Sequence, residues 1–186
     1  MWTGCLALAK AHPTDKASAM TRSKVHNVLF LCTGNSARSI LAEALLNVLG
    51  DGRFRAFSAG SNPSGRVQPI AADLAEQLGY PRDALRSKPW DEFAEAGAPA
   101  MDLIITVCDN AAGEACPVWP GHPAIAHWGV PDPAAVEGSE DLRRHAYLDA
   151  MATLRRRVEL LVALPADKLV RLAAAHALQE IAERTA

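Results

Sequence analysis

The chain has 186 residues, 49% of them hydrophobic, which suits a single domain with a sizeable core. Its formal net charge is −2, so no general attraction to nucleic acid or to an anionic membrane is expected. No apolar run is long enough to span a bilayer, and the run at residues 6–9 is too short for a secretory signal. These features predict a cytoplasmic protein. There the four cysteines serve catalysis or metal binding more often than structural disulfides.

The first part of the chain predicts an extension followed by alternating strands and helices. Residues 1–25 carry no clear hydrophobic period and predict a flexible N-terminal extension, with Met20 as an alternative start. An apolar run over 27–31 predicts a buried strand, and the pattern over 36–49 predicts a helix. Residues 53–58 predict a second strand. Pro69 then suits the first turn of a helix, and Gly79 suits its C-terminal cap.

The second part continues the alternation. Residues 103–107 and 124–128 predict buried strands, and a short helix is expected over 90–96. A long helix is expected from residue 139 to about 163, with the run Arg155-Arg156-Arg157 mostly on its solvated side. Pro165 breaks this helix, and residues 165–186 predict an additional C-terminal helix. Strands that alternate with helices indicate a single α/β domain over 26–164, built on a doubly wound parallel sheet.

A short loop that begins with Cys32 and ends with Arg38 joins the first strand to the first helix. Such a loop points backbone N–H groups at one spot, and the helix dipole favours an anion there. The planar donors of Arg38 match the oxygens of a tetrahedral oxyanion. Cys32 is expected to be a thiolate of lowered pKa, with Ser39 as a hydrogen-bond partner. Gly34 and Asn35 can adopt left-handed conformations. The predicted oxyanion cradle comprises Thr33, Gly34, Asn35, Ser36, Ala37, Arg38 and Ser39. A buried cysteine and an unrelated surface arginine are the alternative.

Three chemically active residues each follow a predicted strand, namely Cys32, Cys108 and Asp132. Ligands of parallel α/β sheets bind beyond the carboxyl ends of the strands, so the three residues should meet at one edge. Asp132 lies between two prolines and can serve as a general acid that protonates a leaving oxygen. An ordinary turn aspartate is the alternative.

Cys108 and Cys116 allow three interpretations. They could be two buried small residues, two ligands of a metal site with His122 and His127, or a redox pair. Their separation is wider than the usual Cys-x2–4-Cys of zinc sites, so no metal is predicted, and His127 is expected to be a satisfied core histidine. A disulfide needs Cα atoms within about 7 Å, and the intervening loop with Gly113 can bring the two together.

Four motifs in order resemble the thioredoxin-coupled arsenate reductases, which share their fold with the low-molecular-weight protein tyrosine phosphatases. The motifs are residues 28–39 (VLFLCTGNSARS), 57–60 (FSAG), 107–117 (VCDNAAGEACP) and 128–133 (WGVPDP). The resemblance covers about residues 27–164. It implies a four-stranded parallel sheet of order 2-1-3-4 with helices on both faces.

The resemblance also implies a thiol relay. Cys32 would attack arsenate held by the loop amides and Arg38, while Asp132 protonates the leaving hydroxide. Cys108 would then attack Cys32 and release arsenite, and Cys116 would attack Cys108 and move the disulfide to Cys108–Cys116. Thioredoxin or a small-thiol system would reduce that disulfide. No tightly bound cofactor is implied, and phosphate and sulfate would compete with arsenate.

One position departs from the pattern of relatives that bind a potassium ion near the loop. Asn35, Glu43 and Ser58 match the oxygen ligands of that ion. Lys88, however, lies where a carboxylate would be expected. Its ammonium would then supply the positive charge in place of the ion, and a surface lysine is the alternative.

Two other functions remain open at this stage. A tyrosine phosphatase would use the same loop and Asp132. Those phosphatases usually carry a second cysteine where this chain has Ala37, and aromatic residues where it has residues 134–136 (AAV), although Trp128 could form one wall of a ring pocket. A non-enzymatic oxyanion or arsenite sensor with three thiol ligands is the other alternative, but no DNA-binding pattern supports it.

Overall fold

The computed structural model describes residues 24–109, 119, 123–165 and 168–169. The strands are β1 (His26–Cys32), β2 (Phe54–Gly60), β3 (Leu103–Thr106) and β4 (Ala124–His127). The α-helices are α1 (Arg38–Leu49), α2 (Pro69–Leu78) and α4 (Glu140–Val162). Short 3-10 helices are η1 (Arg82–Ala84), η2 (Trp90–Phe93) and η3 (Pro133–Ala135). The alternation of strands and helices confirms the α/β prediction.

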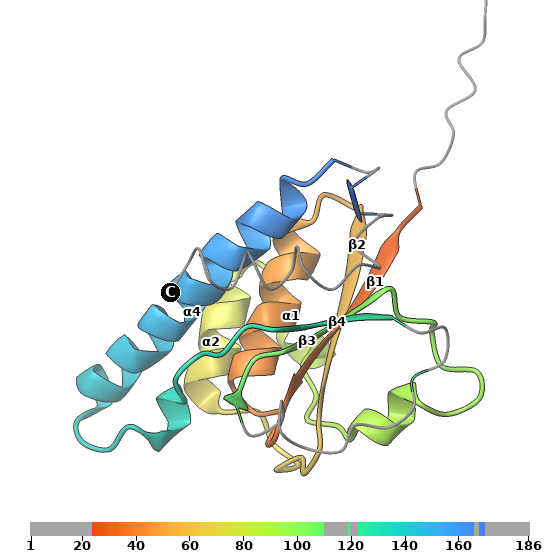
Figure 1. Ribbon diagram of the computed structural model, residues 1–186. Coiled ribbons are helices and arrows are strands. Elements are labelled where there is room, and N and C mark those ends of the chain that lie inside the picture. Colours follow the sequence, from red (N-terminus) through yellow and green to blue (C-terminus); the bar gives the residue numbers. More distant parts are fainter. Residues whose placement is uncertain (1–23, 110–118, 120–122, 166–167, 170–186) are drawn as a thin grey trace, which may run out of the picture.

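The four strands form one parallel sheet in the order β2-β1-β3-β4 (Figure 1), which confirms the order that the resemblance implied. β1 is a central strand, and its last residue, Cys32, pairs with Gly60 of β2. On the other side, Leu31 pairs with Thr106, the last residue of β3. β1 is buried on both faces, which explains why residues 28–31 are all apolar.

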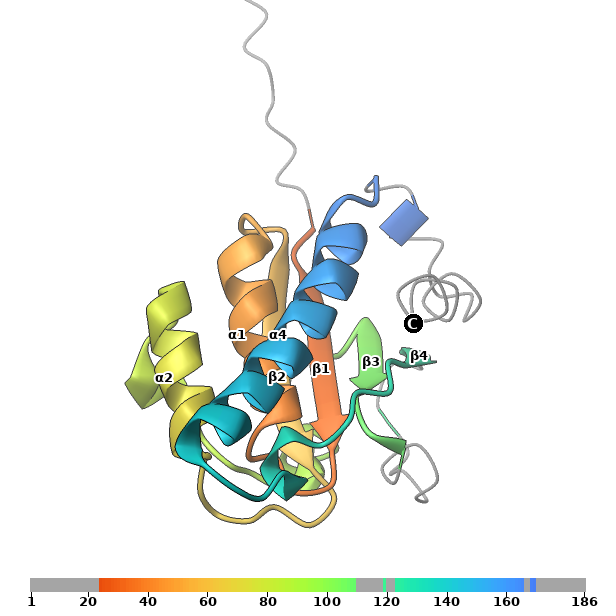
Figure 2. The ribbon, with the colours of Figure 1, turned by 90° about the vertical axis from the view of Figure 1, so that its left-hand side faces the viewer.

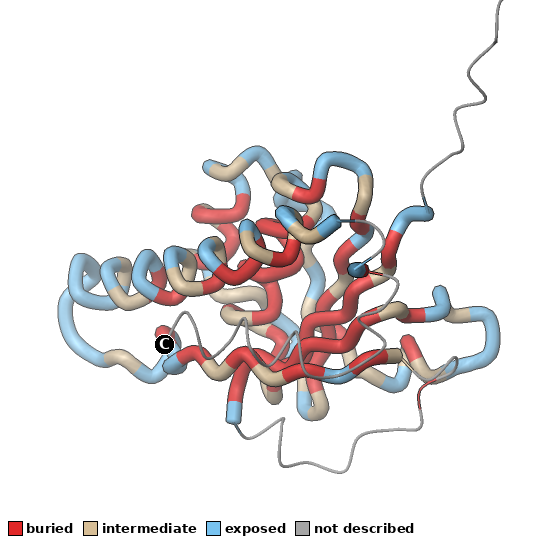
Figure 3. The backbone as a smooth tube through the Cα atoms, turned by 45° about the horizontal axis from the view of Figure 1, so that its top comes forward, coloured by how far each residue is buried: buried red, intermediate tan, exposed pale blue. Residues whose placement is uncertain are grey.

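The helices α1, α2 and α4 lie together on one face of the sheet (Figures 1 and 2). Phe30 of β1, Leu45 of α1 and Leu154 of α4 belong to the core on this side. In the described part of the chain, η2 and Trp119 cover the other face and pack against Leu29 and Leu31. Figure 3 shows mostly buried residues along the strands of the sheet and many exposed residues along the outer side of the long helix α4. Buried residues thus lie on both faces of the sheet, and the predicted cradle begins where the central strand β1 ends, at Cys32.

Most predicted element boundaries agree with the structure to within two residues. α2 begins at Pro69 and is capped by Gly79 in a left-handed conformation (φ 98°), and the Ser139 hydroxyl caps α4. Two helices are shorter than predicted. The helix expected over 90–96 is the 3-10 helix η2. α1 starts at Arg38 rather than at residue 36, because Ala37 (φ −137°, ψ −81°) still belongs to the loop.

The prediction that the arginine run lies on the solvated side is wrong for Arg157. This residue is buried, and its Nη1 donates a hydrogen bond to the Gly129 carbonyl oxygen (3.0 Å). Burial lowers the pKa of the Arg157 guanidinium. Arg157 comes three residues after Leu154, a helical spacing that places both on one side. It therefore holds the loop that leads to Asp132.

Several predicted segments lie outside the described residues. These are almost all of the extension over 1–25 and of the C-terminal helix over 165–186, together with Cys116 and His122. In the parts that the structure describes, no helix is long and apolar enough to cross a membrane.

Candidate active site

The loop between β1 and α1 forms one wall of a cavity of about 290 Å³. Cys32, Thr33, Gly34, Ser36, Ala37, Arg38 and Asp132 line it. Two predicted cradle residues, Asn35 and Ser39, are fully buried behind this wall. Of the two residues expected to adopt left-handed conformations, only Asn35 has a positive φ (41°). The cavity thus combines the nucleophile, the arginine and the carboxylate that the sequence singled out.

The Cys32 sulfur lies in a buried, hydrogen-bonded position. Its Sγ is 3.0 Å from Ser39 Oγ and accepts from the Asn35 backbone N–H (3.2 Å). Burial raises the pKa of the Cys32 thiol more than these hydrogen bonds lower it. This direction is opposite to the lowered pKa that the position at the helix N-terminus predicted.

Arg38 and Asp132 contact each other across the mouth of the cavity. Arg38 Nη2 donates to Asp132 Oδ2 (2.8 Å), and Nη1 donates to the Val130 carbonyl oxygen (3.1 Å). The other carboxylate oxygen, Oδ1, accepts from the Ala134 N–H (3.1 Å). The Asp132 side chain is 41% exposed, so solvent reaches its carboxylate. Two residues 94 positions apart thus meet at the edge where the prediction put them.

Cys108 lies beside the first residue of the cradle. Its Sγ is 3.7 Å from Thr33 Oγ1, and the thiol is buried. The backbone explains this position, because the Val107 N–H donates to the Leu31 carbonyl oxygen (2.8 Å) and extends the β1–β3 pairing to the edge. A second cysteine therefore lies next to the loop that carries Cys32, as the parallel sheet predicted.

A buried polar network lies behind the cradle, with Asn35 at its centre. Asn35 Nδ2 donates to Ser39 Oγ (2.9 Å) and to Ser58 Oγ (2.9 Å), and Oδ1 accepts from the Lys88 backbone N–H (2.8 Å). The Ser58 hydroxyl in turn donates to the Glu43 carboxylate. Because Asn35 and Ser39 both make hydrogen bonds to the Cys32 sulfur, this network supports the position of Cys32.

Lys88 is part of this network, and its interpretation as a surface lysine is wrong. Its side chain is 7% exposed, with Nζ 3.5 Å from Glu43 Oε2. Nζ also lies 3.2 Å from the Arg86 carbonyl oxygen and 3.5 Å from Ser58 Oγ. Burial lowers the pKa of Lys88, while the Glu43 carboxylate opposes that shift. Tyr80 also belongs to this network, because its hydroxyl donates to Glu43 Oε1 (3.1 Å), and no sequence motif predicts this contact.

His127 has a partner at each ring nitrogen. Nδ1 lies 2.8 Å from Thr106 Oγ1, and Nε2 lies 3.0 Å from Asp109 Oδ1. The prediction of a satisfied histidine is confirmed, although its side chain is 33% exposed rather than within the core. Among the described residues, no three His, Cys, Asp or Glu side chains are placed to hold a metal ion.

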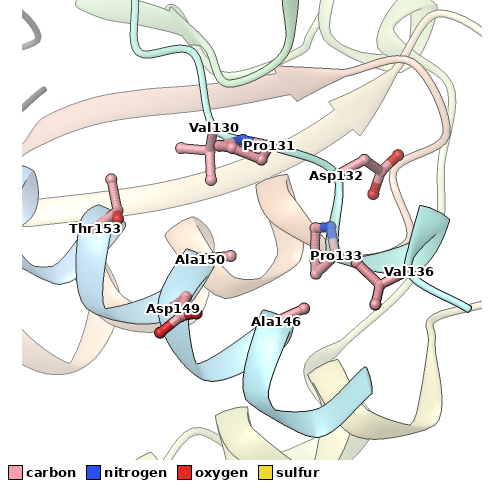
Figure 4. A pocket seen from close by; sticks show the side chains of 9 residues that line it. All are labelled: Val130, Pro131, Asp132, Pro133, Val136, Ala146, Asp149, Ala150 and Thr153. Atoms are coloured by element: carbon pink, nitrogen blue, oxygen red, sulfur yellow. The ribbon is translucent and has the colours of Figure 1, made fainter. Parts of the chain in front are cut away.

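A second, smaller cavity adjoins Asp132. It measures about 170 Å³ and lies between residues 130–136 and α4, with Val130, Pro131 and Ala150 among its walls (Figure 4). No aromatic side chain lines this cavity or the cradle among the described residues. Trp128 is fully buried and packs on Phe30, with ring centroids 6.1 Å apart. The expectation that Trp128 could form a wall for a substrate ring is therefore wrong.

A Cys-x5-Arg loop that leads from a central parallel strand into a helix defines a class of oxyanion-binding α/β proteins. The family model of the low molecular weight phosphotyrosine protein phosphatases matches residues 27–171. The chain belongs to this family.

Several proteins that are similar in sequence to this chain are arsenate reductases. The arsenate reductase of Bacillus subtilis is 36% identical over 115 residues, which cover 61% of this chain and 78% of the relative. Arsenate reductase 1 of Staphylococcus epidermidis is 33% identical over 132 residues, 70% of this chain and 96% of the relative. The crystal structure of the arsenate reductase from Archaeoglobus fulgidus has a TM-score of 0.57 at 29% identity and covers 74% of this chain and 99% of that one.

Proposed function

We propose that this protein reduces arsenate to arsenite through a relay of Cys32, Cys108 and Cys116. The observation that carries the proposal is the position of Cys108, whose Sγ lies 3.7 Å from Thr33 Oγ1 at the edge of the cradle. Hydrolysis of a phosphate ester needs one cysteine, because water completes that cycle. A second buried cysteine beside the first suits a reaction in which sulfur supplies electrons. The arsenate reductases among the relatives support the same activity.

In the first step, the loop amides and Arg38 hold arsenate over Cys32. The Cys32 thiolate attacks arsenic and forms an S–As bond, and an oxygen leaves as hydroxide that Asp132 protonates to water. To hold the oxyanion, the Arg38 guanidinium must exchange its hydrogen bond with Asp132 for hydrogen bonds to the oxyanion. That exchange leaves the Asp132 carboxyl available to take up and deliver the proton.

In the second step, the Cys108 thiolate attacks Cys32 Sγ. A Cys32–Cys108 disulfide forms, the S–As bond breaks, and its electron pair stays on arsenic. Two thiolates are thereby oxidised by two electrons in total, and arsenic(V) is reduced to arsenic(III), which leaves as arsenite. Cys116 then attacks Cys108 Sγ and returns Cys32 as a thiolate.

An external dithiol or thiol must reduce the last disulfide, Cys108–Cys116, to two thiols. Thioredoxin is our proposed donor, with a small-thiol system as the alternative, and no tightly bound cofactor takes part. Phosphate and sulfate should compete for the cradle, since they share the tetrahedral shape and charge of arsenate. A cytoplasmic location, where thiols stay reduced, suits this cycle.

The decisive assay measures arsenate turnover with thioredoxin and its reductase, beside hydrolysis of an aryl phosphate. Steady arsenite production that depends on thioredoxin supports the proposal. Aryl phosphate hydrolysis without arsenate turnover would assign the chain to the phosphatases instead. The absence of both would favour a non-enzymatic sensor.

Arg38→Lys is expected to lower kcat/KM for arsenate by about 100-fold. A lysine keeps the charge but cannot reproduce two parallel hydrogen bonds to a tetrahedral oxyanion. The matched control is Arg156→Lys, an exposed position on α4, which should behave like the unmodified protein. Steady-state kinetics check this result, and an unchanged kcat/KM in Arg38→Lys would show that Arg38 does not hold the substrate.

Potassium is expected to have no measurable effect on activity or melting temperature of the unmodified protein, because the Lys88 ammonium already lies 3.5 Å from Glu43.

Lys88→Met should lower the free energy of unfolding by about 3–5 kcal/mol, since it leaves the buried Glu43 carboxylate without its cation. The melting temperature of the Lys88→Asp variant should rise with added potassium but not with added sodium. Lys24→Met, at an exposed lysine, is the control. A stabilisation of the unmodified protein specific to potassium would contradict this assignment.

A further inference from the structure

The ring of His127 bridges two residues on either side of Cys108. Nδ1 contacts the hydroxyl of Thr106, the last residue of β3, at 2.8 Å. Nε2 contacts the carboxylate of Asp109, the residue directly after Cys108, at 3.0 Å. One side chain on the neighbouring strand β4 thus spans the short segment that carries the thiol.

The chemistry of the partners fixes the roles of the two ring nitrogens. A carboxylate only accepts hydrogen bonds, so Nε2 carries a hydrogen and donates it to Asp109. In the neutral ring, Nδ1 then accepts from the Thr106 hydroxyl. Gly129 makes room for this bridge, because a Cβ there would lie 2.8 Å from Asp109 Oδ1 and 2.9 Å from His127 Nε2.

His127 makes these contacts at the end of the sheet, just after the last backbone hydrogen bonds of β3 with its neighbours. The Val107 N–H donates to Leu31, and the Val107 carbonyl oxygen accepts from the Val130 N–H (3.2 Å). Asp109 lies beyond these contacts, and its side chain is 90% exposed. His127 therefore contacts the chain just past Cys108, at Asp109 (3.0 Å), and just before it, at Thr106 (2.8 Å).

We propose that His127 is a positioning residue for Cys108, one that holds the thiol beside Thr33 in line for its attack on the Cys32 adduct. This inference rests on the proposed relay. The attack needs the Cys108 sulfur placed behind Cys32 Sγ, opposite the S–As bond that breaks, and small displacements slow such steps strongly. The residue acts through Asp109 and Thr106 and does not itself touch arsenate.

The test isolates this single step. In a Cys116→Ser background, the relay stops at the Cys32–Cys108 disulfide, so each chain releases one arsenite. His127→Ala in that background should slow the release by about 10- to 100-fold without changing its amplitude. His127→Gln should restore most of the rate, since its amide can donate to Asp109. His145→Ala removes a histidine from an exposed pair with Asp149 (3.8 Å) and should leave the rate unchanged.

Asp109→Ala breaks the same bridge from its exposed side and should slow the release as His127→Ala does, even if His127→Ala fails to fold. Alkylation of Cys32 by iodoacetamide, with protection by phosphate, checks that the cradle is intact in each variant. A normal rate in His127→Ala or Asp109→Ala would overturn the positioning role and leave the relay standing. If the Cys116→Ser parent releases no arsenite, the relay itself fails.

Discussion

Cys32→Ser is expected to abolish both arsenate reduction and any hydrolysis of aryl phosphates. A hydroxyl at this buried site stays protonated and is a poor nucleophile. Removal of a nucleophile from an enzyme can lower kcat by on the order of 10⁶-fold. The fold should persist, because a serine oxygen can still accept from the Asn35 N–H and interact with Ser39, as the Cys32 sulfur does.

Both activities should be measured on purified protein, with the melting temperature as the check on folding. Cys5→Ser makes the same chemical change in the N-terminal extension and should leave both activities intact. Turnover that survives in a folded Cys32→Ser protein would refute the assignment of the nucleophile. The same result would remove the basis for the relay.

Cys108→Ser and Cys116→Ser should separate reduction from hydrolysis. With serine at position 108, Cys32 can form its adduct, but the thiol that breaks the S–As bond in the proposed relay is missing, so steady-state arsenate reduction should fall to background. Aryl phosphate hydrolysis should stay near that of the unmodified protein, because water releases that intermediate. With serine at position 116, about one turnover per chain is expected, as the disulfide cannot leave Cys32.

Mass spectrometry of peptides from arsenate-treated protein can read these states directly. Cys116→Ser should accumulate a Cys32–Cys108 disulfide, and the unmodified protein should accumulate Cys108–Cys116 when no reductant is present. If Cys116→Ser turned over normally with thioredoxin, an external thiol would have to resolve Cys32 or Cys108, and the relay would be wrong in its last step.

Much of the fold could be predicted because its causes are local. The apolar run at 28–31 is typical of a buried strand, and Pro69 and Gly79 bound α2 through their own backbone preferences. The sheet order was implied by the family resemblance rather than by the patterns. The meeting of Cys32, Cys108 and Asp132 followed from one rule of parallel sheets, since each comes directly after a strand.

The sequence by itself determined which residue types lie at the candidate site, but only the tertiary structure decided their state. The direction of the Cys32 pKa depends on how deeply the sulfur is buried, and the partner of Arg38 is 94 positions away. Lys88 is buried, with its ammonium 3.5 Å from both Glu43 and Ser58, which belong to other elements. Arg157 is buried and donates to the carbonyl oxygen of Gly129, 28 positions away. Desolvation and pairing between distant residues set these properties, and neither is encoded in the local pattern of the chain.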